Sequence, residues 1–187
     1  SHTSNVLAGK IFNIPVSGTH SHSWVLAFDN ELESFRNYAD IMPDNCVLLV
    51  DTFNTMEGIN NAIIVAKELE ELGKKLLGIR IDSGDLAYLS KKARKKLDSE
   101  GLDYVSIVAS NDLDEFLVES LKNQKSKISI WGIGTKLVTA YDNPSLGAVY
   151  KLTALKNDKN EWEKKIKLSE QKIKINNPGI NQVMRFK

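Results

Sequence analysis

The feature that most constrains the fold is a short apolar segment followed directly by polar residues, because this unit recurs along the chain. The segments at 14–17, 47–50, 76–81, 104–108 and 128–131 have the length and composition of buried strands. Strands that alternate with helices about every 25 to 30 residues form βαβ units, which join parallel strands by right-handed crossovers. The sequence therefore predicts an α/β fold with about five parallel strands.

Helices are predicted between these strands. Apolar residues at helical spacing place them at 24–37, 59–72, 86–97 and 113–121. Gly73 has the position of a helix-terminating glycine.

The pattern changes after Pro144. Residues 149–155 alternate between apolar and polar side chains, 157–160 have the composition of a turn, and further strand-like segments follow. Glutamates are interspersed among the lysines of this tail, which favours a solvated sheet face over a basic patch. We therefore predict an α/β portion over residues 1–147 and an antiparallel β extension over 148–187.

Charge and hydropathy argue against several classes of partner. Lysine and arginine number 25 and aspartate and glutamate 24, so bulk charge favours neither a nucleic acid nor a membrane surface. No apolar run approaches the roughly 18 residues of a membrane span, and we expect no signal peptide. The single cysteine, Cys46, cannot form an internal disulfide, and its place beside a predicted strand indicates a buried thiol. We expect a cytoplasmic protein that binds a small molecule.

Carboxylates follow two of the predicted strands. Asp82 and Asp85 come after the strand at 76–81, and Asp51 comes after the strand at 47–50. Parallel sheets and α/β barrels place their ligands at the carboxyl ends of the strands. Carboxylates at such an edge suit sugar hydroxyls, a magnesium ion, or both.

Each of these residues also has a structural alternative. Arg80 lies two residues before Asp82 and therefore on the same side of the strand, where it either pairs with Asp82 or reaches an anionic group of a substrate. Asp85 has the position of a helix N-cap, and Asp51 that of a turn former.

The two later strand ends carry different chemistry. Asn111 and Asp112 follow the strand at 104–108, and Asp112 with Glu115 has the spacing of a capping box. Residues 132–136, Gly-Ile-Gly-Thr-Lys, suit a phosphate, because glycine lets the backbone approach and exposed amides at a helix start attract anions. The segment is not a P-loop, whose glycines are spaced more widely.

His20 and His22 form an H-x-H pattern after the strand at 14–17. In some metal-dependent hydrolase barrels this pattern supplies two metal ligands, but no histidine follows His22 in this chain. A neutral histidine can instead act as a nucleophile towards phosphate, or as a general acid or base. A metal-dependent hydrolase that uses His20 and His22 remains an alternative.

Seven segments occur in a specific order. They are TSNVLAG (3–9), GTHSHSW (18–24), VDT (50–52), GIRIDSGDL (78–86), SNDLDE (110–115), GIGTKL (132–137) and LGAVYKL (146–152). Together they resemble the nicotinate phosphoribosyltransferase family. The resemblance implies a type II phosphoribosyltransferase with an irregular (β/α) barrel. Such an enzyme joins nicotinate to phosphoribosyl pyrophosphate, giving nicotinate mononucleotide and pyrophosphate for NAD salvage, and couples this transfer to ATP hydrolysis.

The resemblance also implies roles for individual residues. His22 matches the histidine that ATP phosphorylates, whereas His20 occupies a position where the family is variable. Asp82 and Arg80 match the pair that handles the ribose and base region, and Asp51 lines the same pocket. Further substrate-binding positions fall on Thr19, Ser83, Asp85, Asn111 and Asp112, and the loop that holds the nucleotide 5′-phosphate falls on Gly132, Gly134 and Thr135.

Cofactors and partners follow from the same resemblance. It implies Mg²⁺ bound together with phosphoribosyl pyrophosphate and ATP, and a homodimer in which active sites are completed across the two chains. Family members carry a region before Thr3 and continue past Phe186, so we expect this chain to be the barrel portion of a longer enzyme and to be inactive alone. A phosphate-binding barrel module without turnover is therefore a second alternative.

Overall fold

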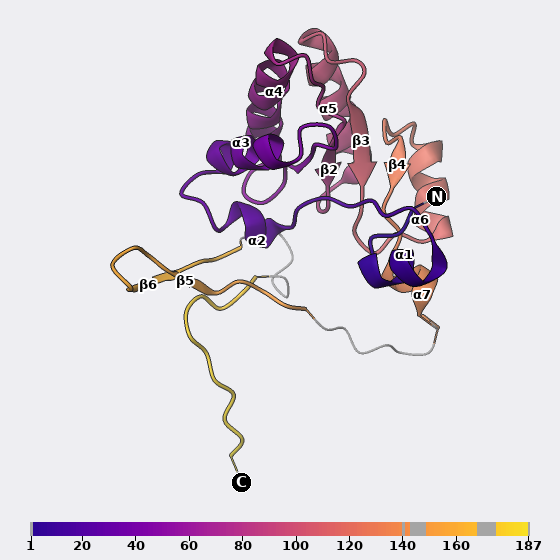
Figure 1. Cartoon of the computed structure of the whole chain (residues 1–187). Coiled ribbons are helices and arrows are strands. Elements are labelled where there is room, and N and C mark those ends of the chain that lie inside the picture. The colour runs from indigo at the N-terminus through magenta and orange to yellow at the C-terminus, as the bar shows by residue number, and fades with distance from the viewer. Residues whose placement is uncertain (1, 140, 143–148, 168–174, 187) are drawn as a thin grey trace.

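A four-stranded parallel sheet forms the centre of the fold (Figure 1). The computed structural model describes residues 2–139, 141–142, 149–167 and 175–186. The strands are β1 (Val47–Leu49), β2 (Gly78–Ile81), β3 (Ser106–Ala109) and β4 (Ile130–Trp131). Their spatial order is the order of the sequence, with Leu48 opposite Ile79 and Ile79 opposite Ile107. The predicted parallel α/β fold is confirmed, with four strands in the sheet rather than about five among the described residues.

Helices join the strands at the predicted places. They are α4 (Thr55–Glu71) between β1 and β2, α5 (Leu86–Ser99) between β2 and β3, and α6 (Glu115–Asn123) between β3 and β4. The side chain of Asn54 accepts hydrogen bonds from the first turn of α4, and Gly73 follows its end with a φ of 70°. The helix stop predicted at Gly73 is confirmed.

The hydrophobic core lies between the sheet and these helices. Leu48, Ile79 and Ile107 from three adjacent strands are fully buried and belong to one cluster with Ile59 of α4. Burial of each such side chain contributes roughly 1.5 to 3 kcal/mol to stability. Cys46 is part of this cluster, as predicted, and burial raises the pKa of its thiol to about 12.

Two elements predicted near the N-terminus are wrong. Residues 14–17 form no strand; an isolated parallel bridge joins Val16 to Thr3, and Pro15 has no N–H with which to extend a ladder. The single helix predicted over 24–37 is instead α2 (His22–Val25) and α3 (Glu31–Ile41), which follow α1 (Val6–Phe12). The break arises because the side chain of Asn30 accepts the N–H of Glu33 at 2.9 Å and starts a new helix.

The C-terminal part contains a separate antiparallel pair. Strand β5 (Ala154–Lys156) pairs with β6 (Trp162–Lys164) around the turn predicted at 157–160. The strand expected over 149–155 is thus confined to its end, and residues 175–186 form no strand. The predicted boundary at 147–148, and the motif residues 146–148, lie outside the described residues.

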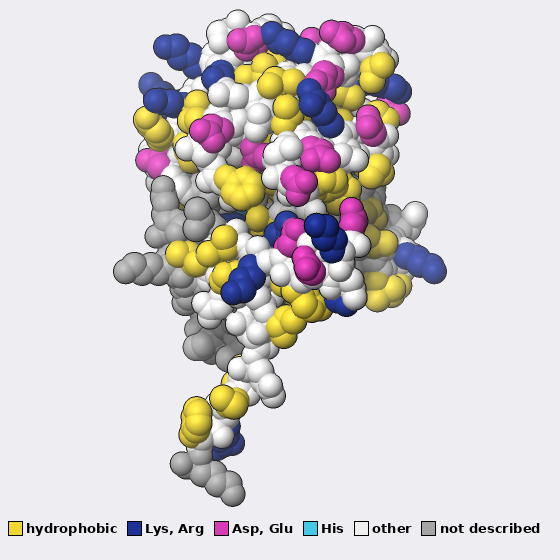
Figure 2. Space-filling model, turned by 90° about the vertical axis from the view of Figure 1, so that its left-hand side faces the viewer, with side chains coloured by type: hydrophobic (Ala, Val, Ile, Leu, Met, Phe, Trp, Pro, Cys, Tyr) yellow, Lys and Arg dark blue, Asp and Glu magenta, His cyan; other side chains and the backbone are white. Residues whose placement is uncertain are grey.

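Charged side chains of both signs are interspersed on the surface. Figure 2 shows lysines and arginines beside aspartates and glutamates on one face of the molecule. The near balance of charges in the sequence therefore extends to the arrangement of charges on that face. None of the helices in the described ranges is long and apolar enough to cross a membrane.

Gly58 lies in α4 where this helix passes the end of β1. A Cβ atom on Gly58 would lie 2.0 Å from the carbonyl oxygen of Val50. In an isolated helix, alanine is about 1 kcal/mol more stabilising than glycine. Here, however, the added methyl group would clash with the backbone of Val50. We therefore expect Gly58→Ala to lower the free energy of unfolding by about 1 to 3 kcal/mol in urea titrations.

The matched control for this prediction is Gly18→Ala. A Cβ atom on Gly18 meets nothing within 4 Å, so this change should alter the free energy of unfolding by less than about 0.5 kcal/mol. Equal effects of the two substitutions would contradict the steric explanation.

Candidate active site

Polar residues follow three neighbouring strands and meet at one edge of the sheet. Asp51 follows β1, Asp82 follows β2 and Ser110 follows β3. Backbone hydrogen bonds continue the sheet to this edge, because the N–H of Val50 donates to Arg80 and that of Ser110 donates to Ile81. Three of the strand ends that the sequence predicted to form a site are therefore in contact.

Three side chains of the site contact the carboxylate of Asp82. Its Oδ1 accepts from the Ser110 hydroxyl at 2.5 Å and from Arg80 Nη2 at 3.1 Å. Burial disfavours its charge, but contacts with His22, Ser110 and Arg80 outweigh burial and hold the pKa of Asp82 well below its usual range. Asp82 is therefore ionised at neutral pH.

The guanidinium of Arg80 joins three segments of the chain. Its Nη2 contacts Asp82, its Nε donates to the Ser110 hydroxyl at 2.8 Å, and its Nη1 donates to Thr19 Oγ1 at 2.8 Å. Of the two alternatives for Arg80, the structure contains the pairing with Asp82. The bond to Thr19 also brings the loop that follows α1 onto the strand ends.

One carboxylate oxygen of Asp51 makes structural hydrogen bonds, and the other has no hydrogen-bond partner. Its Oδ2 accepts from the backbone N–H of Asp82 at 2.9 Å and from the hydroxyl of Ser83 at 2.6 Å. The residue is only 5% exposed, and its Oδ1 is buried without a hydrogen-bond partner. Asp51 thus shapes the turn after β2 and keeps one acceptor that faces no donor.

His22 lies at the start of α2, against the ends of β1 and β2. Its Nδ1 is 3.1 Å from the hydroxyl of Thr52, while its Nε2 is 3.6 Å from Asp82 Oδ2. The Nε2 atom is buried and has no hydrogen-bond partner. One nitrogen is thus held by Thr52, and the other lies beside an ionised carboxylate without a hydrogen-bond partner.

His20 has a different environment, which argues against the metal site. Its Nε2 accepts the N–H of Leu49 at 3.1 Å, and its Nδ1 is 3.4 Å from the carbonyl oxygen of Ser21. Both ring nitrogens therefore face backbone groups. The described part of the chain also holds no cluster of three or more His, Cys, Asp or Glu side chains that could bind a metal ion.

The predicted helix caps were right at one strand end and wrong at another. Asp85 caps α5 by accepting the N–H of Tyr88 at 2.9 Å. The capping box at Asp112 is absent, because the N-cap of α6 is Asp114, which accepts from Leu117. Asn111 and Asp112 have φ of 101° and 49°, and this left-handed turn delays the start of the helix.

The glycine-rich loop at 132–136 connects β4 to α7 (Thr135–Val138). A Cβ atom on Gly132 would lie 3.3 Å from Ser110 Cβ, so glycine lets this loop pass closely over the end of β3. Gly134 takes the N-cap position of α7 without a side-chain cap. The loop therefore lies beside the strand ends, with Thr135 in the first turn of the helix.

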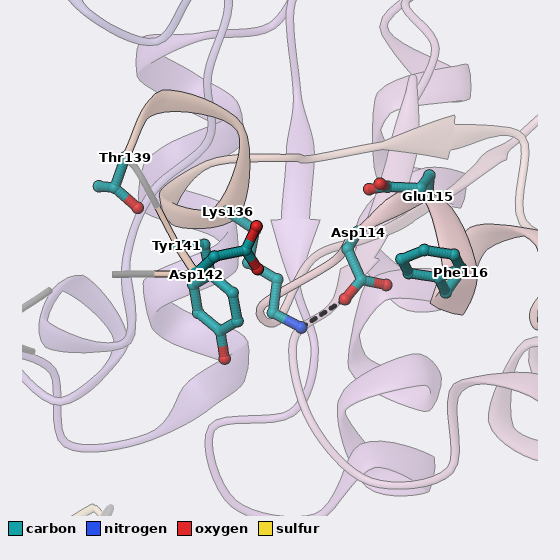
Figure 3. Close-up of a pocket in the computed structure, with 7 residues that line it drawn as sticks. All are labelled: Asp114, Glu115, Phe116, Lys136, Thr139, Tyr141 and Asp142. Atoms are coloured by element: carbon teal, nitrogen blue, oxygen red, sulfur yellow. Dashed lines mark hydrogen bonds and ion pairs between the residues drawn. The ribbon is translucent and has the colours of Figure 1, made fainter. Parts of the chain in front are cut away.

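Lys136 forms a pair that the sequence did not predict. Its Nζ is 2.5 Å from Asp114 Oδ2 and 4.7 Å from the centre of the Tyr141 ring (Figure 3). The ion pair raises the pKa of Lys136 and lowers that of Asp114. The lysine lines a cavity of about 330 Å³ between α6 and the residues after α7. Within it, the ammonium group of Lys136 is paired with Asp114 and lies over the Tyr141 ring.

The fold and site define an α/β protein with polar side chains gathered at the carboxyl ends of parallel strands, the usual place for the ligand of such a sheet. The model of the nicotinate phosphoribosyltransferase (NAPRTase) family matches residues 1–177. The chain belongs to this family.

Known relatives agree with this assignment. The chain is 53% identical over 185 residues to a nicotinate phosphoribosyltransferase of Bacillus subtilis, covering 98% of this chain and 37% of that protein. A Mycobacterium tuberculosis protein named nicotinate phosphoribosyltransferase pncB2 is 40% identical, with 98% and 38% covered. The chain thus spans well under half the length of these relatives.

Solved structures show the same fold. The nicotinate phosphoribosyltransferase of Porphyromonas gingivalis superimposes with a TM-score of 0.68 at 26% identity, covering 94% of this chain and 47% of that one. The Vibrio cholerae nicotinate phosphoribosyltransferase gives the same TM-score at 18% identity, with 93% and 44% covered, and supports the fold alone.

Glu31 is a buried carboxyl group that the motifs did not single out. It is 7% exposed at the start of α3; its Oε2 accepts from Asn61 at 2.9 Å, and its Oε1 has no partner. Burial raises the pKa of Glu31 to about 7, and the negative charges of Asp51 and Glu57 add to this effect. The helical spacing of apolar residues does not reveal Glu31, because this residue lies at the polar start of α3.

We expect Glu31→Gln to stabilise the protein in a pH-dependent way. The folded pKa lies above the unfolded value, so ionisation of Glu31 costs stability as pH rises from about 4.5 through 7. The uncharged glutamine should therefore leave stability nearly unchanged at pH 4.5 and raise the free energy of unfolding at pH 8 by about 2 to 3 kcal/mol. Urea unfolding at several pH values measures this difference.

The control is Glu33→Gln, two residues further along on the exposed side of α3. It should show no comparable rise between pH 4.5 and 8. If the free energies of unfolding of Glu31→Gln and the parent protein differed by the same amount at every pH, the raised pKa would not belong to Glu31.

Proposed function

We propose that this chain carries the catalytic strand ends of an ATP-coupled nicotinate phosphoribosyltransferase. The observation that supports this most is the state of His22. Its Nε2 is buried without a hydrogen-bond partner, 3.6 Å from the carboxylate of Asp82, which Arg80 binds through its other oxygen. A histidine with one tethered and one free nitrogen, next to an ionised acid, suits nucleophilic attack on phosphorus.

The first step of the proposed reaction uses His22 as nucleophile. Its Nε2 attacks the γ-phosphorus of ATP, a P–N bond forms, and the P–O bond to the β-phosphate breaks to release ADP. The hydroxyl of Thr52 holds Nδ1, and the negative charge of Asp82 stabilises the positive charge that develops on the ring. Water later hydrolyses the phosphohistidine to inorganic phosphate and restores the ring.

The second step transfers the phosphoribosyl group. The ring nitrogen of nicotinate attacks C1 of phosphoribosyl pyrophosphate while the C–O bond to pyrophosphate breaks, so a positive charge develops on the sugar. Asp82, kept ionised by its neighbours, is suited to bind the ribose hydroxyls and to stabilise this charge. Arg80 positions Asp82, and Thr19, Ser83 and Asp51 extend the same polar wall.

Phosphate groups are proposed to lie at the loop of Gly132, Gly134 and Thr135. Its exposed backbone runs beside the strand ends, where amides can donate to a 5′-phosphate. Asn111, Asp112 and Asp85 border the same edge; Asp85 is already used as a helix cap, so its contribution to substrate binding is through its second oxygen.

Mg²⁺ is proposed to arrive with phosphoribosyl pyrophosphate and ATP. The buried, unpartnered Oδ1 of Asp51 is a hard oxygen of the kind that Mg²⁺ binds. Magnesium is usually bound by one or two carboxylates together with substrate phosphates, which fits a site with few acids. When bound, the ion would neutralise the leaving pyrophosphate.

The wider assembly is also a proposal. We infer that the four-stranded sheet is part of an irregular barrel closed by further strands, that residues 148–187 extend it, and that two copies of the full-length protein form a dimer.

The exposure of the loop at 132–135 favours a second candidate function, a phosphate-binding module without turnover. Product formation by the full-length protein from nicotinate and phosphoribosyl pyrophosphate would exclude that candidate.

We expect His22→Ala in the full-length protein to abolish ATP-stimulated turnover while some ATP-independent transfer remains. Labelled ATP should leave acid-labile phosphate on the parent protein and none on this variant, because Nε2 of His22 is the acceptor. His2→Ala removes an exposed histidine outside the site and should be labelled normally. Equal labelling of His22→Ala and the parent would contradict the role of His22.

We expect Asp82→Asn to reduce the rate of transfer by roughly two to three decades, since it removes the charge that opposes the positive sugar. The asparagine oxygen can still accept from Ser110 and Arg80, so the protein should fold, but its melting temperature should fall, because the lowered pKa of Asp82 means that the ionised carboxylate stabilises the fold. Asp40→Asn, at an exposed position of α3, is the control for charge removal. A large fall in melting temperature with near-normal turnover would show that Asp82 is only a structural partner of Arg80.

A further inference from the structure

His20 is buried in the loop before α2, between the edge strand β1 and helix α3. The residue is 7% exposed, and its ring meets Tyr38 edge-on at 4.7 Å and Phe35 at 5.9 Å between ring centres. A polar ring in such apolar surroundings is stable when its nitrogens have hydrogen-bond partners.

The partners of His20 define its protonation state. The N–H of Leu49 donates to Nε2 at 3.1 Å, so Nε2 must be the acceptor and carries no proton. The Nδ1–H then donates to the carbonyl oxygen of Ser21 at 3.4 Å. Burial lowers the pKa of His20 to about 4, and the charge of Arg80 acts in the same direction, so the ring is neutral at physiological pH.

The bond to Leu49 attaches a catalytic loop to the sheet. Leu49 is the last residue of β1, two positions before Asp51, and no further strand pairs with its N–H on that side among the described residues. His20 supplies the acceptor that a neighbouring strand would otherwise provide. Of the residues that flank His20, Thr19 contacts Arg80, and Ser21 directly precedes His22.

Thr19 and Ser21 show how this attachment reaches the reacting groups. Thr19 accepts from Arg80 and lies 3.1 Å from the carbonyl oxygen of His20, to which its hydroxyl donates. Ser21 is the N-cap residue of α2, and His22 is the first residue of that helix. The position of His20 therefore determines two things. One is the contact of Thr19 with Arg80, and the other is the orientation of His22 at the start of α2.

We propose that His20 is a positioning residue for His22, acting through the bond from the Leu49 N–H to its Nε2. This inference rests on the proposed role of His22 as phosphoryl acceptor. It requires an acceptor atom at the end of the side chain, not a histidine as such. Glutamine, whose amide oxygen can reach the same N–H, should therefore replace His20, whereas leucine, with similar bulk and no acceptor, should not.

The experiment measures the rate of His22 phosphorylation by labelled ATP in the full-length protein. We expect His20→Leu to slow phosphorylation about 10- to 100-fold, because a shift of about 1 Å in a reacting atom has an effect of this order. His20→Gln should restore the rate to within about threefold of the parent. The KM for ATP should change much less than the rate in both variants, since the loss is in alignment and not in binding.

Phe35→Leu separates positioning from general destabilisation. Phe35 contacts the His20 ring and is fully buried in the core, but it makes no hydrogen bond to the loop. This control should lower the melting temperature as much as His20→Leu or more while leaving the phosphorylation rate within about threefold of the parent. All variants are compared at a temperature well below their melting transitions.

A second measurement does not depend on turnover. Diethyl pyrocarbonate acylates accessible imidazole nitrogens, and mass spectrometry locates the product on His22. His22 should react several-fold faster in His20→Leu than in the parent or in His20→Gln, because its side chain, 18% exposed in the parent, is held less firmly when the loop is detached from β1.

The outcomes distinguish a failure of the proposed phosphorylation of His22 from a failure of the positioning role of His20. If the parent protein is never phosphorylated on His22, the proposed function fails, and acylation alone then decides whether His20 positions His22. If the parent is phosphorylated and His20→Leu matches it in both rate and acylation, the positioning role is refuted. Loss of phosphorylation in His20→Gln equal to that in His20→Leu would also refute it.

Discussion

The candidate site depends on the guanidinium of Arg80 at the end of β2. Its three nitrogens donate to Thr19, Asp82 and Ser110, which belong to three segments far apart in the sequence. A guanidinium is planar and permanently charged, so these bonds fix direction as well as distance. A lysine would bring a single point charge to this position and would not hold the three segments in one arrangement. Arg80 therefore helps to align the loop that carries His22 with the strand ends, together with the bond from the Leu49 N–H to His20.

The buried carboxyl groups of this protein differ because their neighbours differ. Asp82 has an arginine, a hydroxyl and a histidine around it, and these donors keep it ionised despite its burial. Glu31 has only the amide of Asn61 as a donor, and burial raises its pKa to about 7. Donors are missing at Oδ1 of Asp51, although this residue also lies at a strand end, and that buried oxygen has no hydrogen-bond partner.

The sequence by itself determined the order of elements and the edge of the sheet at which the polar residues gather. Strand length, apolar content and helical spacing are local properties, so they located β1 to β4 and helices α4 to α6 to within a few residues. The pairing of Arg80 with Asp82 was also predictable, because residues two apart on a strand share one side. The cap at Asp85 followed from the same local reasoning. The seven ordered segments were sufficient to suggest the family to which the chain belongs.

Only the tertiary structure decided how residues from different segments share the site. His20 and His22 look alike in the sequence, yet His20 accepts a backbone N–H from β1 and His22 faces Asp82, and these contacts link residues about 30 or 60 positions apart. The capping box at Asp112 failed because the backbone there takes a left-handed turn, which the residue types permit but do not require. Local patterns determine the elements, whereas a contact between distant segments depends on how the core brings them together.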